Sequence, residues 1–153
     1  MTMVKEKPAI VFVRDEVNEI ILLVATDKGA FLYFSGADRR HWDVSGPHFM
    51  GSLIHHLVLD PRDDKTLLAS VQSRITGTTI YSSTDFGKTW IAAKKPPKFP
   101  ESKVKRTVDH VFFLVPGHED EINVWYAGTS PQGLFRSEDG GKTWDSIDGF
   151  NEN

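Results

Sequence analysis

The sequence predicts an all-β protein built from repeated, four-stranded antiparallel sheets. Three observations support this prediction. Short apolar or alternating runs recur between turn residues, an eight-residue box ending in Trp occurs twice, and no stretch keeps a helical period. The chain has 153 residues, the length of about one domain, and 39% of them are hydrophobic, which is enough to build a buried core.

The repeated box reads Ser-x-Asp-x-Gly-Lys-Thr-Trp and occupies residues 83–90 and 137–144. A degenerate copy at 35–42 keeps the Ser and the Trp but lacks the Asp, Gly and Thr. The three Trp residues are therefore spaced by about 50 residues, and a repeat of this length with several short strands is typical of a β-propeller blade.

Each repeat is expected to contribute four strands, which gives three blades at approximately 8–50, 51–103 and 104–150. Turn residues such as Asp60-Pro61 and Pro116-Gly117 separate the strands. The expected strands are 9–14, 19–26, 30–35 and 42–44 in the first blade, 54–59, 66–71, 78–83 and 89–93 in the second, and 108–115, 123–129, 133–137 and 143–147 in the third.

The box is expected to close the hairpin between the third and fourth strands of a blade. A short Asp or Ser side chain accepts hydrogen bonds from backbone N–H groups across a turn, Gly adopts positive φ without strain, and Trp buries a large apolar face between sheets. The residues expected to play this structural role are Ser83, Asp85, Gly87, Thr89, Trp90, Ser137, Asp139, Gly141, Thr143 and Trp144.

The chain resembles the BNR-repeat, or Asp-box, propellers of the sialidase-like superfamily. The resemblance rests on the segments 46–49, 59–62, 116–118 and 133–144. The chain is similar in particular to bacterial BNR-repeat proteins described as glycosyl hydrolases. It implies a propeller fold and a carbohydrate or protein ligand. The sequence departs from sialidases in two respects: Arg14 is followed by Asp15-Glu16 instead of Ile-Pro, and no residues match the Tyr/Glu nucleophile pair.

Three blades are fewer than the roughly four to eight of a closed propeller. We therefore expect the chain to be the N-terminal part of a longer propeller, or to associate with a second copy of itself. A small open fold is the remaining alternative.

Two histidines are candidate ligand-binding residues. When the inner strands of the second and third blades are aligned on Leu59 and Leu114, His55 and His110 fall at the same register, which would place both on the channel wall. The alternative is a packing histidine repeated with the blade. Asp109, beside His110, is the candidate catalytic acid or base, or else an ordinary residue at the start of a strand.

Two loop residues complete the candidate site. His48 lies between two blades, and Arg74 lies near Ser73 and Thr76, where it could bind a carboxylate; both could equally be solvated loop residues.

Asp85 and Asp139 are not expected to form a catalytic pair, because they lie on equivalent hairpins of different blades. His55 and His56 are not expected to bind a metal, since adjacent strand residues point to opposite faces.

Composition restricts the partners. The chain has no cysteine, which excludes disulfides and thiolate metal sites, and its net charge is −3. The basic segment 94–106 is interrupted by prolines and is expected to be a solvated loop between blades, without affinity for nucleic acid. No cofactor, no metal and no membrane association are expected, and the cytoplasm is the expected location.

These features favour a propeller module that binds a ligand or partner around its channel, without a recognisable catalytic set. The alternative is a sialidase-like glycoside hydrolase, with Asp109 as acid or base and His55, His110 and Arg74 as substrate contacts. Its active site would be completed by further blades or by a second chain.

Overall fold

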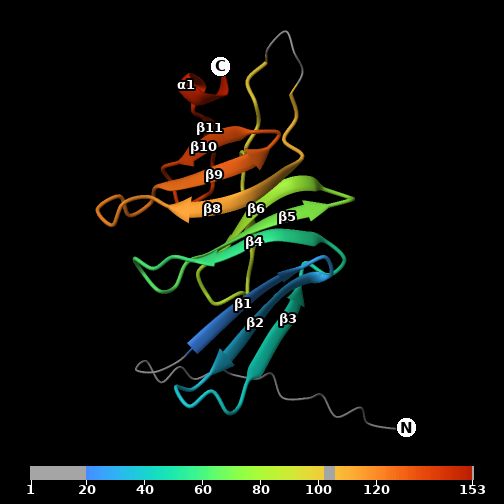
Figure 1. Cartoon of the computed structure of the whole chain (residues 1–153), viewed down its shortest axis with the longest axis vertical. Helices are drawn as coiled ribbons and strands as arrows, with labels where there is room; N and C mark the ends of the chain where they lie inside the picture. Colours follow the sequence, from blue (N-terminus) through green and yellow to red (C-terminus); the bar gives the residue numbers. More distant parts are fainter. Residues whose placement is uncertain (1–19, 102–105, 153) are drawn as a thin grey trace.

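The computed structural model describes residues 20–101 and 106–152, which form three antiparallel sheets of strands consecutive in the chain (Figure 1). This confirms the predicted all-β architecture. The first sheet contains β1 (Ile20–Thr26), β2 (Gly29–Ser35) and β3 (Asp43–His48), the second contains β4 (Leu53–Leu59), β5 (Leu67–Ser73), β6 (Gly77–Ser83) and β7 (Ile91–Ala92), and the third contains β8 (His110–Pro116), β9 (Trp125–Ser130), β10 (Gly133–Ser137) and β11 (Asp145–Ser146).

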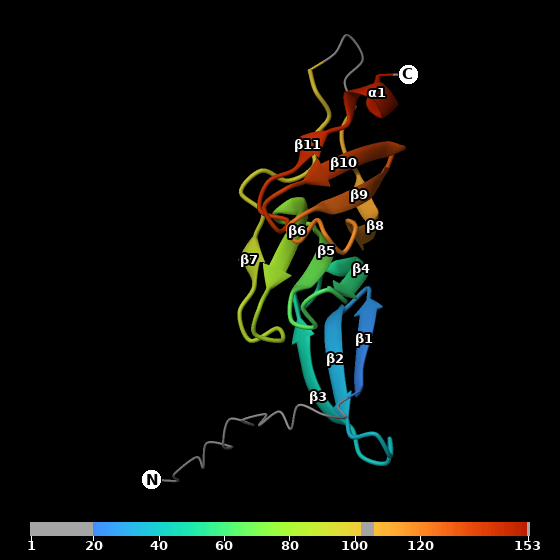
Figure 2. The same cartoon turned by 90° about the vertical axis from the view of Figure 1, so that its left-hand side faces the viewer.

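The three sheets, called blades 1, 2 and 3 below, follow one another along the long axis of the molecule (Figure 1). Their first strands β1, β4 and β8 lie along one side, and their last strands β3, β7 and β11 lie along the other (Figure 2). Contacts join β1 to β4 and β4 to β8. The strand expected at 9–14 lies outside the described residues, and three strands of the first blade are described.

Blade 2 packs against both neighbours through opposite faces of β5. Leu67, Ala69 and Val71 belong to the core shared with blade 1, whereas Leu68 belongs to the core shared with blade 3. Because successive residues of a strand point to opposite faces, a strand buried on both sides reads as a continuous apolar run. The five residues 67–71 are all at most 2% exposed.

Both boxes make the hydrogen bonds expected of them. In the second box, Ser137 donates to Asp139 Oδ1 at 2.8 Å and accepts from the Gly141 N–H at 2.9 Å. The Asp139 carboxylate also accepts from the N–H and the hydroxyl of Thr143, at 2.9 and 2.7 Å. The first box repeats the same bonds among Ser83, Asp85, Gly87 and Thr89. The carboxylate therefore closes the turn by bonding the returning strand.

The degenerate copy keeps the turn without its Asp. Arg39 stands at the position of the box glycine and still has a φ of 56°, and Trp42 Nε1 donates to the Arg39 carbonyl at 3.2 Å. Trp144 makes the equivalent bond to the Gly141 carbonyl at 3.0 Å. Trp144 is 1% exposed, whereas Trp42 is 40% exposed, so the first blade retains the turn geometry but not the burial of the ring.

The segment after β7 is not the fully solvated loop that its charge suggests. Lys95 pairs with Thr143 in an isolated parallel bridge, and the Trp144 N–H donates to the Lys95 carbonyl at 2.9 Å. Phe99 is 5% exposed and lies between the ring of Phe135 and the guanidinium of Arg106. The segment therefore joins the outer edge of blade 3, because Phe99 supplies an apolar anchor.

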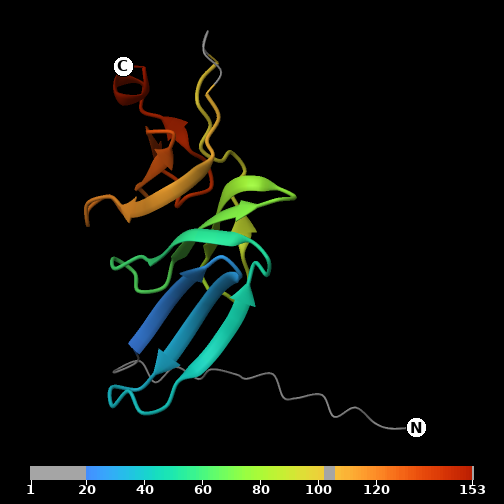
Figure 3. The same ribbon diagram turned by 45° about the vertical axis from the view of Figure 1, so that its right-hand side comes forward.

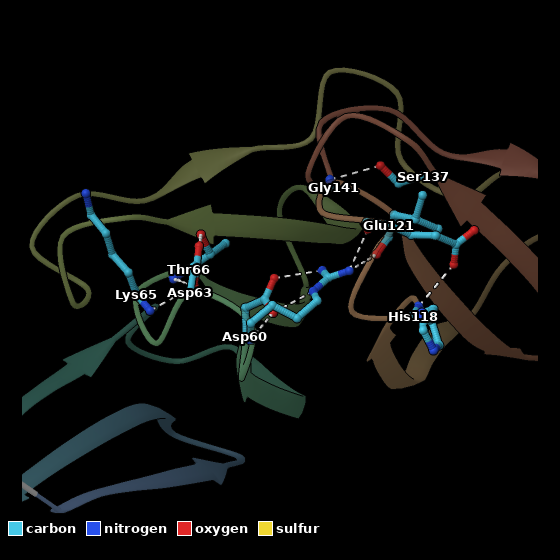
Figure 4. Close-up of polar contacts among 10 residues, drawn as sticks. Asp60, Asp63, Lys65, Thr66, His118, Glu121, Ser137 and Gly141 are labelled. Carbon is cyan, nitrogen blue, oxygen red and sulfur yellow. Dashed lines mark hydrogen bonds and ion pairs between the residues drawn. The ribbon is translucent and has the colours of Figure 1, made fainter.

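A buried ion pair connects blade 2 to the β8–β9 loop of blade 3 (Figure 4). Arg62 Nη2 and Asp60 Oδ2 are 2.7 Å apart, and the two side chains are 8% and 4% exposed. Arg62 Nη1 donates to the carbonyls of Glu121 at 2.7 Å and Val124 at 3.2 Å, and the guanidinium lies over the buried ring of Trp125. Arg62 thus adds a second hydrogen bond to two carbonyls of the neighbouring blade, which also accept from main-chain N–H groups.

One short helix, α1 (Asp148–Asn151), follows β11 and was not expected from the sequence. Its residue Asn151 accepts from the Leu134 N–H at 2.8 Å and donates to the Leu134 carbonyl at 2.7 Å. The Asn151 side chain therefore bonds the main chain of Leu134 beyond the point where β11 pairs with β10. Within residues 20–101 and 106–152, no helix has the length and apolar character needed to cross a membrane.

The Asp-box carboxylates predict an acid-dependent loss of stability. Burial raises the pKa of Asp139, but the hydrogen bonds from Thr143, Ser137 and Lys142 outweigh it, so the pKa lies below its ordinary value. Since a lowered folded-state pKa stabilises the protein above about pH 4, Asp139→Ala should cost about 2 kcal/mol at pH 7, and its difference from the wild type should shrink between about pH 4 and pH 2.

Urea denaturation of both proteins across this range measures the effect. Lys142→Ala is the matched control, because it changes an exposed side chain in the same turn and leaves the carboxylate in place. A stability difference for Asp139→Ala that is the same at both ends of the range would contradict the assignment.

The buried ion pair gives a second prediction. Arg62→Ala leaves the buried Asp60 carboxylate without its cationic partner and removes one of the two donors to each of two blade 3 carbonyls, so it should lower the free energy of unfolding by about 3–5 kcal/mol. Lys65→Ala, an exposed substitution in the same loop, should change it by less than about 0.5 kcal/mol. Equal effects of the two substitutions in urea denaturation would show that the ion pair does not hold the blades together.

Candidate functional site

The candidate site is centred on two histidines at the junction of blades 2 and 3. His55 in β4 and His110 at the start of β8 stack, with their ring centroids 4.2 Å apart and their planes 11° apart. Both are half-buried. The structure therefore brings together the two histidines that the sequence singled out.

Their meeting does not come from equivalent positions, and the alignment of Leu59 with Leu114 is wrong. Leu57 pairs with Ala69, and Leu114 pairs with Ala127. These alanines pair in turn with the residues two positions before the Ser of each box. Leu57 is therefore the equivalent of Leu114, and the true alignment differs by two residues.

The two inner strands carry equivalent β-bulges. The pairing of β4 with β5 shifts by one residue at His55, and the pairing of β8 with β9 shifts by one residue at Phe112. His55 is thus the equivalent of Phe112, and Leu53 is the equivalent of His110. A bulge re-aims the side chain of the extra residue, and in β4 the extra residue is one of the two stacked histidines.

Polar contacts from three strands hold the histidine pair. His55 Nε2 lies 2.9 Å from Gln72 Oε1, and His110 Nδ1 lies 2.7 Å from Asp109 Oδ2. Gln72 Nε2 donates to the main-chain carbonyl and the carboxylate of Asp109, at 3.2 and 3.4 Å, and the Thr78 hydroxyl donates to the same carbonyl. The Asp109 side chain remains 65% exposed.

This arrangement fixes which imidazole nitrogens carry protons in the neutral rings. Gln72 presents its oxygen to His55, so His55 Nε2 is the donor. Asp109 accepts from Nδ1 of His110, which leaves Nε2 of that ring as the acceptor. His55 Nδ1 and His110 Nε2 make no hydrogen bond with the described residues, so each ring keeps one nitrogen for a ligand.

A hollow of about 630 Å³ adjoins this cluster. It is lined by residues of blades 1 and 2, namely Asp27, Lys28, Gly51, Leu53, Gln72, Ser73 and Arg74. The turn of β1–β2, the β3–β4 connection and the turn of β5–β6 lie on the same side of the molecule (Figure 3). Gln72 lines the hollow and contacts both His55 and Asp109, so the hollow and the histidine pair are continuous.

The predicted loop residues differ in their surroundings. Arg74 is exposed at the hollow and makes no hydrogen bond or ion pair with the described residues. His48 instead bonds Ser45 through Nε2 at 3.0 Å and packs edge-on against Trp90, with ring centroids 5.9 Å apart. Burial lowers the pKa of His48. Its ring therefore contacts Ser45 of its own strand and Trp90 of the first box rather than the other candidates.

The Asp boxes lie at the opposite end of the strands from this site. β6 begins at Gly77, beside the tip that carries Arg74, and ends at Ser83, where the first box starts. The carboxylates of Asp85 and Asp139 therefore accept hydrogen bonds within turns that are remote from the hollow. They do not form a pair of carboxylates around one bond.

Sequence reasoning missed two residues that join blade 2 to the bulge of β8. His56 Nδ1 accepts from the Leu114 N–H at 3.0 Å, and its ring stacks on Phe113. The buried Ser70 hydroxyl donates to the Val111 carbonyl. Both side chains satisfy backbone groups beside the bulge, and a signal for them would have required knowing where the bulge lies.

The described residues do not suggest a metal centre. Within 20–101 and 106–152, no group of three or more His, Asp or Glu side chains is placed to hold an ion. The stacked histidines present parallel rings rather than converging nitrogens. The site offers instead hydrogen-bond donors and acceptors, one unpaired guanidinium and an open hollow.

Comparisons with known proteins agree with this architecture. The sequence profile of the BNR-Asp box repeat matches residues 134–147, which include the whole second box and β11. No curated protein sequence matches the chain. The fold is similar to the GH74 xyloglucanase from Xanthomonas campestris, at 18% identity and a TM-score of 0.56, over 76% of this chain and 19% of that one.

The fold is also similar to YCF48 bound to D1 peptide, at 15% identity and a TM-score of 0.54, over 85% of this chain and 36% of that one. The chain thus spans about a fifth and about a third of the two proteins. Both neighbours are β-propellers. The chain has the fold of a partial β-propeller and contains a BNR-Asp box repeat.

Proposed function

We propose that this propeller module binds a ligand in the hollow and over the adjoining histidine pair, without catalysing its conversion. The observation that carries the proposal is the position of Gln72, which lines the hollow and contacts both His55 and Asp109. Side chains from all three blades therefore form one continuous polar surface. Ligand sites commonly form where packed units meet.

The polar groups of this surface are arranged for recognition. The free nitrogens of His55 and His110 provide one acceptor per neutral ring, and Arg74 provides a charged donor without a described partner. Gln72 and Thr78 hold Asp109 in place. A ligand that bridges the hollow and the histidines would meet groups that are already oriented, which lowers the ordering cost of binding.

Glycoside hydrolysis is the rival hypothesis, and it needs two carboxyl groups roughly 5–9.5 Å apart around one bond. Asp109 is the candidate acid, and Asp27 is the carboxylate that lines the hollow. Asp27 pairs with Lys28 at 3.3 Å, and Asp109 pairs with His110. The likeness to a xyloglucanase concerns the fold, so this hypothesis depends on groups supplied by further blades or by a second chain.

Panels of immobilised glycans and synthetic peptides test the proposal directly. We expect the chain to capture members of at least one panel, with affinity reduced about tenfold by Arg74→Ala, which corresponds to about 1.4 kcal/mol. Arg40→Ala, in the exposed β2–β3 loop, is the matched control and should leave binding unchanged.

Chromogenic glycosides, including a sialoside, supply the opposing measurement. The proposal expects no turnover above that of Asp109→Asn. Turnover that disappears in Asp109→Asn would establish the hydrolase instead, and failure to capture any glycan or peptide would contradict binding at this surface.

A further inference from the structure

We infer that the ligand of this hollow is an acidic peptide of a partner protein, in which a carboxylate side chain stands beside an apolar one. This inference rests on the proposed function and names the class of its ligand. It follows from two properties of the surface that the histidine pair does not explain, namely an unpaired positive charge and aliphatic side chains at its margin.

The charge of the hollow favours an anion. Its charged lining residues are Asp27, Lys28 and Arg74. Asp27 and Lys28 pair with each other at 3.3 Å, which leaves Arg74 as the charge without a described counterion. A guanidinium binds a carboxylate through two parallel hydrogen bonds, so a carboxylate side chain would complement this position.

Exposed apolar side chains lie on the segments that line the hollow. Ile75, next to Arg74 in the chain, is 95% exposed, Met50, next to Gly51, is 77% exposed, and Leu53 in the lining is 37% exposed. Such side chains offer apolar area that a bound peptide would bury. A carbohydrate would instead favour aromatic rings, and the described lining contains none.

These side chains stand on ordered turns. The Ser73 hydroxyl accepts from the N–H groups of Ile75 and Thr76, at 3.1 and 3.3 Å, which shapes the β5–β6 turn. The Gly51 N–H donates to the Lys28 carbonyl at 3.2 Å, which ties the β3–β4 connection to the β1–β2 turn. Arg74 and Ile75 thus share one ordered turn, and Met50 precedes a connection that is bonded to the β1–β2 turn.

Three sets of synthetic peptides of about ten residues test this assignment by fluorescence anisotropy. Each peptide has a Gly/Ser background and carries the pair Asp-Leu, Asn-Leu or Asp-Ser at its centre. We expect the Asp-Leu set to bind, and both other sets to bind at least about tenfold more weakly, because each lacks one of the two contacts. Binding of Asp-Leu should weaken with added salt.

Variants locate the contacts. Arg74→Ala and Ile75→Ser should each weaken Asp-Leu binding by about tenfold. Ile122→Ser, which changes an aliphatic side chain that is 72% exposed in the β8–β9 loop, should leave it unchanged, as should Arg40→Ala. Circular dichroism of each variant checks that the sheets are intact.

The outcomes separate this inference from the function on which it rests. Equal binding of the three sets, or binding insensitive to Ile75→Ser, would overturn the acidic-peptide assignment. Capture of a glycan that depends on Arg74 would also overturn it, while leaving the ligand-binding function in place. Absence of binding to every peptide and glycan would overturn both.

Discussion

The structure depends on the burial of β5 between two neighbouring sheets. One face of this strand packs on blade 1 and the other packs on blade 3, and its residues 67–71 are almost completely buried. A strand with two apolar faces cannot remain exposed on either side without a large hydrophobic cost. Blade 2 is therefore stable only between two neighbouring blades. This requirement places β1 of blade 1 and β8 of blade 3 on either side of β4.

The candidate site is a consequence of this stacking. Because β4 and β8 lie side by side, the bulge in β4 directs His55 onto His110, and Gln72 at the end of β5 reaches both His55 and Asp109. The opposite end of blade 2 carries the Asp box, whose Ser83 and Asp85 side chains bond within their own turn. In blade 2, one end thus carries the loops around the hollow and the other end carries the Asp-box turn.

Local features of the fold could be predicted from the sequence, since they depend on residues close together in the chain. The turn of each box follows from its Ser, Asp, Gly and Thr, and the strands follow from alternating or continuous apolar runs. The position of the degenerate turn also follows, although Arg39 replaces the glycine.

Features that depend on packing between blades could not be predicted. The apolar run of β4 contains both Leu57 and Leu59, and the strand pairing identifies Leu57 as the equivalent of Leu114, so the alignment on Leu59 was wrong although the two histidines do meet. Arg62 looked like an ordinary turn residue, and its partners in blade 3 are about 60 residues away. The helix α1 is too short to produce a periodic pattern.

Native-state hydrogen exchange measured by NMR tests the central claim most directly. If the two-sided packing of β5 holds the three blades together, the amides of Leu68 and Ser70 should exchange only through global unfolding, with the same free energy as urea denaturation gives. Exchange of these amides at rates similar to those of the outer strands β7 and β11 would contradict the account.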